Sequence, residues 1–341
     1  MNHLNKTNSR LSSNPLPEDK EEMISLWQTT FQDSDEFADL FFNRVYKPEN
    51  TLVIKSGGKI VSALQIIPYE IKTTTDIIPS AYVCGVCTLT LERGKGLMSI
   101  LMNEAIDEMR QKGYGITTLI PAHPWLFDIY KKFGYIHQIN YCIESYSCGV
   151  CSNKTHLSQT ATIEINSDKI LHGAKANSPE KPHNYFSDYK ITPYTREYFH
   201  YFDKKQRERR CAVLHNIYNV ENIIRDLSHD GGNAWIALHE NAPVGIAFVN
   251  PKSEKDIAIK EILYDNTQAK EALIYHILNT YNGQTAKVYT PPSDTLATEV
   301  NNISNTLSSC ISTKTYPYGL ACILDKQITD IQGLHMTLML D

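Results

Sequence analysis

The sequence predicts an α/β (α+β) fold with a mixed sheet that occurs twice in tandem along the chain. Three observations lead to this prediction. A strand, a glycine-rich turn and a helix follow one another over residues 82–109. The hairpin pattern at 51–68 returns at 234–251, which indicates an internal repeat. The chain has 341 residues, 42% of them hydrophobic, and this is enough for the cores of two domains.

The first half predicts two helices, a hairpin, further strands and two strand–helix units. Apolar residues at helical spacing mark the two helices at Met23, Ile24, Leu26 and Trp27 and at Phe37, Leu40, Phe41 and Val45. The hairpin joins strands at 51–54 and 60–68 through Gly57 and Gly58. The predicted order is α-α-β-β-β-β-α-β-α-β, ending near residue 150.

The joint Arg93-Gly94-Lys95-Gly96-Leu97-Met98 has the chemistry of a phosphate site. It follows a strand rich in β-branched and aromatic residues and precedes an amphipathic helix. The two glycines let an anion approach the free N–H groups at the start of the helix. The helix dipole, Arg93 and Lys95 all favour negative charge there. The joint therefore predicts a cradle for phosphate or pyrophosphate.

The spacing in this loop separates it from two other phosphate-binding motifs. The sequence has no G-x-x-x-x-G-K-[ST], and no G-x-G-x-x-G followed by a ribose-binding acid. Arg93-x-x-Gly96 instead resembles the [RQ]-x-x-G-x-[GA] loop of the GNAT acyltransferases, although Met98 stands where that loop has a small residue. The resemblance implies that Arg93, Gly94, Lys95, Gly96, Leu97 and Met98 bind the pyrophosphate of acetyl-CoA.

A second motif lies one helix and one strand further along the chain. Residues 116–121 predict a strand, and residues 125–135 resemble the family's [FI]-Y-x-x-x-G-[FY] element, a short helix that ends at a glycine. The resemblance implies that Tyr130 is the general acid that protonates the thiolate of departing CoA. A phenol can donate a proton in a low-dielectric slot without carrying charge beforehand. The alternative is a tyrosine with only a packing role.

The resemblance also implies two further sets of contacts. The backbone of Val86, Cys87 and Thr88 would pair with the pantetheine arm like an added strand. Phe31 and Asp33 stand where enzymes of the family line the substrate pocket, and an acid there would attract a cationic amine. Alternatively, Asp33 is the N-cap of the following helix.

The second half repeats the hairpin but not the glycine loop. A constant shift superposes Val61 on Val244 and Pro68 on Pro251. Helices are predicted at 198–207, 220–227 and 269–280, and strands at 257–263, 286–289 and 318–324. The joint before the last of these helices has no glycine, and Asp265 would repel a pyrophosphate. This copy is therefore expected to wall the substrate cleft without binding CoA.

The predicted organisation is a tail at 1–18, a catalytic domain at 19–150, a linker at 151–190, a degenerate second domain at 191–325 and a C-terminal segment at 326–341. An active domain followed by a degenerate copy resembles the Eis-type (enhanced intracellular survival) acetyltransferases. Those enzymes acetylate amines of aminoglycosides and other polycationic or lysine-bearing substrates. Their third, sterol-carrier-like domain is not expected here. In that family the C-terminal carboxylate acts as the base, and whether Asp341 reaches the site stays open.

Composition narrows the class of partner. The net charge is −5 and no cluster of lysine or arginine stands out, which argues against nucleic acid. No run of about twenty apolar residues and no apolar signal segment occur, so we expect a cytoplasmic protein with no membrane partner. Cys84 and Cys87 are an odd number of positions apart on a strand, so they are expected to face opposite sides as free thiols, with no metal bound.

Together these features predict an acetyl-CoA-dependent N-acetyltransferase. The acetyl group would pass directly to a primary amine of a small cationic or lysine-bearing substrate, either a small molecule or a peptide. The general base is unassigned, and a homo-oligomer stays open. One alternative is a catalytically silent CoA-binding regulatory or scaffold module. Another is a tandem-GNAT ligase that uses aminoacyl-tRNA, but such enzymes generally lack an intact pyrophosphate loop.

Overall fold

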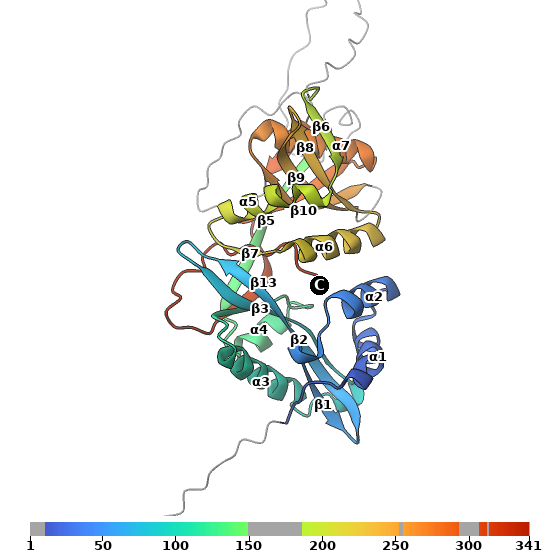
Figure 1. Cartoon of the computed structure of the whole chain (residues 1–341), viewed down its shortest axis with the longest axis vertical. Coiled ribbons are helices and arrows are strands. Elements are labelled where there is room, and N and C mark those ends of the chain that lie inside the picture. Colours follow the sequence, from blue (N-terminus) through green and yellow to red (C-terminus); the bar gives the residue numbers. More distant parts are fainter. Residues whose placement is uncertain (1–10, 149–185, 252–254, 293–306, 312–313, 341) are drawn as a thin grey trace, which may run out of the picture.

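A computed structural model describes residues 11–148, 186–251, 255–292, 307–311 and 314–340. Most of the predicted linker lies outside these residues, as does Asp341. Figure 1 shows two halves stacked along the long axis of the molecule, with β5 (His137–Cys148) reaching from one half into the other.

The first half follows the predicted order with one strand fewer before the long helix. Before β5 its elements are α1 (Lys20–Phe31), α2 (Asp35–Arg44), β1 (Thr51–Ser56), β2 (Lys59–Lys72), β3 (Ile77–Thr88), α3 (Leu97–Gln111), β4 (Ile116–Leu119) and α4 (Leu126–Lys131). Three strands precede α3 where four were predicted. The reason is that β2 continues through Pro68 as one strand of 14 residues, up to a turn in which the Thr73 N–H donates to Asp76 O at 2.8 Å.

The second half adds three strands that the pattern did not predict, β6, β7 and β12. Its elements are β6 (Tyr189–Pro193), α5 (Phe199–Glu208), β7 (Ala212–Leu214), α6 (Ile217–His229), β8 (Asn233–His239), β9 (Ala242–Pro251), β10 (Asp256–Tyr264), α7 (Thr267–Thr280), β11 (Thr285–Thr290), β12 (Leu307–Ile311) and β13 (Tyr316–Ile323). The repeat extends to the turns of the two hairpins. Gly57 and Gly58 have φ of 59° and 84°, and Glu240 and Asn241 at the equivalent positions have 51° and 65°. Both hairpins thus close with two residues at positive φ, as type I′ turns require.

Eleven of the thirteen described strands follow one path, in the order β1-β2-β3-β4-β13-β5-β11-β10-β9-β8-β6, while β7 pairs with β2 and β12 with β5. Each half contains a parallel pair joined through a helix, β3 with β4 and β10 with β11. β5 serves both halves, because residues 137–141 pair with β13 and residues 142–147 pair with β11. The predicted tandem fold with mixed sheets is confirmed, and its two sheets share a strand.

The boundary drawn at residue 325 does not follow the sheets. β13 was expected to close the second domain, but it is inserted between β4 and β5 and completes the sheet of the first half. The alternation of apolar residues shows that a segment is a strand, but it carries no information about which of two sheets the strand joins.

The sheet of the first half is covered on both faces. α3 packs on one face, against Leu64 and Val83. α1 and α2 pack on part of the other face, against Val53 and Ala63. The rest of that face is covered by residues 328–339. The predicted C-terminal segment is therefore part of the core of the first half.

Candidate active site

The two strands that flank the predicted cofactor slot separate beyond Tyr82. β3 and β4 pair only where residues 80–82 lie opposite residues 116–118. Past this point β3 continues to Thr88 and stays paired with β2 on its other side. The backbone edge of Val86, Cys87 and Thr88 toward β4 thus has no strand partner among the described residues, which leaves it open to an extended ligand.

A bulge interrupts β3 along this free edge. Cys87 lies opposite Ala63 and Cys84 lies opposite Gln65, so an extra residue of β3 is accommodated between them. Gly85 has a φ of 58°, the left-handed conformation that starts one common type of bulge. Bulges bend a strand locally and are frequent beside active sites.

Trp27 of α1 packs directly on the bulge. Its ring is 5% exposed, and a Cβ atom at residue 85 would lie 2.2 Å from its Cζ3 atom. The indole Nε1–H donates to Asp33 Oδ2 at 2.8 Å, and the Phe31 ring lies 4.9 Å from the indole ring. The two predicted substrate residues are thus connected to the bulge through Trp27.

Asp33 does not cap the second helix. The N-cap of α2 is Ser34, whose side chain accepts from the Phe37 N–H. The carboxylate of Asp33 instead accepts the indole N–H and is exposed to solvent. The alternative role for Asp33, as an N-cap, is therefore wrong.

The space beside the two glycines of the loop between β3 and α3 is empty. Gly94 and Gly96 both have a φ of 79°, and nothing lies within 4 Å of the place where a Cβ atom would stand at either residue. Gly96 is the N-cap of α3, and no side chain caps this helix. The first turn of α3 carries no acidic residue. Its backbone N–H groups are therefore accessible to an anion.

The side chains of the loop either face solvent or anchor the helix. Arg93 and Lys95 are exposed, Arg93 with its Nε 3.2 Å from Thr88 O and Lys95 with its Nζ 2.8 Å from Glu92. Leu97 and Met98 are half-buried and pack on the core beneath α3. Met98, which departs from the family's small residue, thus helps to hold the start of the helix.

Tyr130 is a buried phenol at the core side of α4. It is 7% exposed and belongs to the same cluster as Val83 and Leu119. Burial raises its pKa to about 12, and Cys84 adds to this effect. Among the described residues no hydrogen bond to its hydroxyl is found, whereas the hydroxyl of neighbouring Tyr135 lies 3.1 Å from Thr117 Oγ1. Tyr130 therefore keeps its proton at neutral pH and has it available for a ligand.

The equivalent joint of the second half is closed by its own side chains. The Asn266 side chain accepts from the Ala269 N–H at 2.8 Å and caps α7. Asp265 lies 3.3 Å from Lys205 Nζ. The amide that a phosphate would use at the start of α7 is thus already occupied.

The expectation that Cys84 and Cys87 face opposite sides of the sheet is wrong, although both are free cysteines. Cys84 and Cys87 both contact the cluster under α1 and α2, so they lie on one face of the sheet. The bulge adds a residue between them and restores the same orientation over an odd spacing. Burial raises the pKa of the Cys87 thiol to about 12, so this thiol stays protonated. The sequence Cys-Gly-Val-Cys of residues 84–87 recurs at 148–151, where Cys151 lies outside the described residues.

Two other expectations concern metals and membranes. In the part of the chain that the structure describes, no group of three histidine, cysteine, aspartate or glutamate side chains is arranged to hold a metal ion. None of the described helices combines the length and the apolar character needed to cross a membrane.

Sequence reasoning missed Trp27 and Gly85 as parts of the site. Trp27 was used only to mark a helix, and Gly85, which lies between Cys84 and Cys87, was not considered for the site. A glycine within a strand pattern is a known signal of a bulge, so Gly85 could have been found. Trp27 could not, because its contact with Gly85 depends on how α1 packs across the sheet.

Residues 15–137 match the model of the family described as acetyltransferase (GNAT) domain. This interval contains the bulge, the glycine loop and Tyr130. The chain therefore contains a GNAT acetyltransferase domain, and the predicted class of enzyme, an N-acetyltransferase, is confirmed. No curated protein sequence matches the chain.

Solved structures resemble the chain over both halves. A probable N-acyltransferase from Enterococcus faecalis V583 matches with a TM-score of 0.65 and 14% identity, and the match covers 92% of this chain and 72% of that protein's chain. A GCN5-related N-acetyltransferase from Anabaena variabilis ATCC 29413 matches with a TM-score of 0.66, 14% identity and coverage of 92% and 72%. Eis1 from Mycobacterium abscessus matches with a TM-score of 0.60, 10% identity and coverage of 90% and 72%. At these identities the similarity concerns the fold.

Proposed function

We propose that this protein is an Eis-like acetyltransferase that passes an acetyl group directly from acetyl-CoA to a primary amine. The observation that carries the proposal is the sequence of features along β3 and into α3. A bulge at Gly85, a free backbone edge up to Thr88 and an open glycine loop follow one another. Acetyl-CoA is an extended thioester with a pyrophosphate at its far end. The order of these features along the chain matches the order of the thioester, the pantetheine arm and the pyrophosphate in this ligand.

The residues of the slot have complementary roles in holding acetyl-CoA. The edge of Val86, Cys87 and Thr88 that has no strand partner offers backbone groups to the amides of the pantetheine arm, and an arm that pairs with Thr88 O would replace its contact with Arg93 Nε. The N–H groups from Gly94 to Met98 offer a concave set of donors to the pyrophosphate. Arg93 and Lys95 add positive charge beside them.

In the reaction, the amine attacks the thioester carbonyl, a C–N bond forms and the C–S bond breaks. Backbone donors of the separated β3 stabilise the oxyanion, and Tyr130 donates its proton to the departing sulfur. The raised pKa of the phenol keeps its proton in place at neutral pH. The proton of the attacking ammonium goes to a base that is unassigned, and Asp341 lies outside the described residues.

The acceptor is a small cationic or lysine-bearing amine. Asp33 supports this class because its exposed carboxylate, held by the Trp27 indole, lies near Phe31 beside the bulge. A carboxylate in this place attracts a cation. The second half walls the cleft without binding CoA. Its helix α6 contacts α2, with Arg44 Nε donating to Asn222 Oδ1 at 2.6 Å. A cytoplasmic location and self-association stay predictions.

Thiol release from acetyl-CoA across an amine panel tests this function. The panel contains spermidine, kanamycin and a lysine-bearing peptide, and the acetylated product is confirmed by mass spectrometry. We expect turnover with at least one amine that depends on enzyme concentration and is lost in Gly96→Glu. Binding of acetyl-CoA without turnover for any amine would instead indicate a silent CoA-binding module.

A further inference from the structure

The C-terminal segment, residues 334–340, packs between the two halves and contacts both of them. Residues 334–340 are all buried, and the described chain ends at Leu340. The segment is tied to β7, because the Val213 N–H donates to His335 O at 2.9 Å and the His335 N–H donates to Cys211 O at 3.1 Å. β7 in turn pairs with β2 of the first half. Through β7, the segment is therefore connected to the sheet of the first half. It also contacts residues of the second half.

The apolar residues of this segment reach the catalytic half on two sides. Met336 and Met339 belong to the cluster on the sheet face opposite α3, and Cys84 beside the bulge packs against the same cluster. Leu338 and Leu340 belong to another cluster, against which Phe37 of α2 packs. The end of the described chain thus lies between α2 and the face of β3 that carries Cys84.

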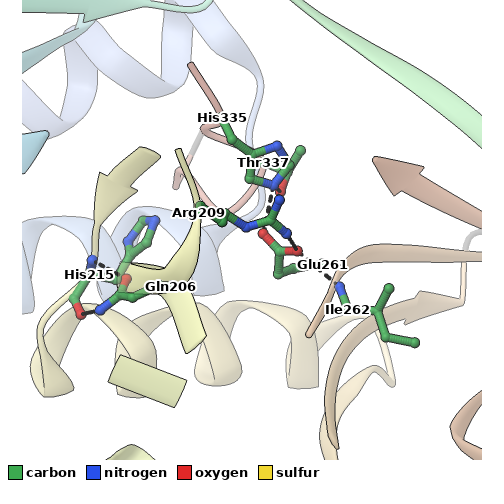
Figure 2. A network of polar contacts seen from close by, with 7 residues as sticks. All are labelled: Gln206, Arg209, His215, Glu261, Ile262, His335 and Thr337. Atoms are coloured by element: carbon green, nitrogen blue, oxygen red, sulfur yellow. Dashed lines mark hydrogen bonds and ion pairs between the residues drawn. The ribbon is translucent and has the colours of Figure 1, made fainter. Parts of the chain in front are cut away.

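Glu261 of β10 holds the segment by its polar residues (Figure 2). Its carboxylate lies 2.6 Å from His335 Nε2 and accepts from Thr337 Oγ1 at 3.3 Å. It also accepts from Arg209 and from the Ile262 N–H. Glu261 is 4% exposed and follows a bulge of β10, since Ile259 lies opposite Val249 and Glu261 lies opposite the next residue of β9, Phe248. In the second half, the residue after the bulge of β10 thus anchors the C-terminal segment. In the first half, the bulge of β3 instead lies beside the strand edge that has no partner.

A buried ion-pair cluster is a costly way to obtain stability, since desolvation offsets most of the attraction. What polar contacts do supply is register. The segment carries methionines and leucines on both sides of His335 and Thr337, so apolar packing alone would tolerate a shifted alignment. Only one alignment lets His335 and Thr337 both reach Glu261. The cluster therefore determines where Met336, Met339 and Leu340 stand.

We propose that Glu261 is a positioning residue for acyl transfer. Together with Arg209, His335 and Thr337, it fixes the C-terminal segment in the position where this segment lines the part of the site that receives the amine. This inference rests on the function proposed above. Glu261 itself lies in the second half and touches neither the free edge of β3 nor the glycine loop in the described contacts. Its loss is therefore expected to affect the amine and to spare acetyl-CoA.

Two variants test the role of the cluster. Thr337→Val keeps the shape of the side chain and removes its bonds to Glu261 and His335, and Glu261→Gln removes the charge that Arg209 faces. For the best amine of the spermidine, kanamycin and peptide panel, we expect kcat/KM to fall about tenfold or more, mainly through a higher KM. The calorimetric Kd for acetyl-CoA should stay within about twofold. Hydrogen exchange of residues 331–340 should become faster, with that of α3 unchanged.

Glu144→Gln is the matched control. Glu144 of β5 forms a separate buried ion pair with Lys270 of α7, and its described contacts do not include the C-terminal segment. This variant should lose stability with unchanged kinetics for the amine. If Thr337→Val, which is expected to fold, behaves like Glu144→Gln in an active enzyme, the positioning role is overturned and the proposed function stands. If the wild type turns over no amine, both proposals fall together.

Discussion

The indole of Trp27 lies against the backbone of Gly85, so close that a Cβ atom at residue 85 would stand 2.2 Å from Cζ3 of the ring. This contact joins α1 to the bulge of β3 at the point where the candidate slot begins. Any side chain at residue 85 has to displace the indole and, with it, the hydrogen bond from Nε1 to Asp33.

Gly85→Ala should therefore destabilise the protein and disturb the site. We expect the free energy of unfolding to fall by about 2–4 kcal/mol, from overpacking and from the positive φ together. Gly57→Ala is the matched control, because its φ of 59° is nearly the same and nothing lies within 4 Å of the added Cβ. It should cost only about 1 kcal/mol. Equal losses in urea denaturation would show that the contact with Trp27 does not matter.

Gly96→Glu should abolish binding of acetyl-CoA in a folded protein. The new carboxylate would stand at the start of α3 and repel the pyrophosphate, for an expected loss of at least about 2–3 kcal/mol of binding free energy. Gly113→Glu controls for the strain, since its φ of 78° and its empty surroundings match those of Gly96 at the other end of α3. Calorimetry that finds the same Kd in both variants would contradict the cofactor assignment.

One molecule of acetyl-CoA should bind per chain. The side chain of Asn266 occupies the Ala269 N–H in the first turn of α7, and the carboxylate of Asp265 beside it repels an anion, so the second joint is a poor site for a pyrophosphate. Native mass spectrometry or calorimetry measures this ratio directly. A ratio of two would mean that the second half binds the cofactor despite its capped helix.

Tyr130→Phe should slow the chemical step and leave acetyl-CoA affinity nearly unchanged. A positioned general acid contributes about 10²–10⁴-fold, and we expect the low end because a thiolate is a fair leaving group by itself. Tyr135→Phe is the control, since it removes a buried hydroxyl that bonds to Thr117 and should reduce stability by about 1 kcal/mol without changing kcat. Full turnover in a folded Tyr130→Phe enzyme would assign Tyr130 a packing role only.

Stability should fall between pH 6.5 and pH 4, in part through His215. Burial lowers the pKa of this histidine from 6.5 to about 4 in the folded protein. The unfolded chain therefore binds more protons within this interval, so acid favours unfolding. In His215→Gln the loss of unfolding free energy from pH 7 to pH 5 should be smaller by about 2 kcal/mol than in the wild type. A loss in His215→Gln identical to that of the wild type would contradict the prediction.

The sequence by itself determined the helices of the first half and the residue types at the joints between its strands and helices. Helical spacing located α1, α2 and α3, and the loop from Arg93 to Met98 followed from the glycines and charges within it. Tyr130 was predicted in the same way, from a motif that a short helix and Gly134 define. These features are local, because period, capping and backbone freedom act between residues close in sequence.

Only the tertiary structure decided how distant segments meet. The insertion of β13 between β4 and β5, the packing of Trp27 on Gly85 and the anchoring of the C-terminal segment by Glu261 each join residues far apart in the chain. Strand periodicity does not specify a partner strand. Hydrophobicity alone also does not specify which apolar surface of the protein a segment such as 336–340 packs against. Such choices depend on shape and polar partners that exist only once the two halves are assembled.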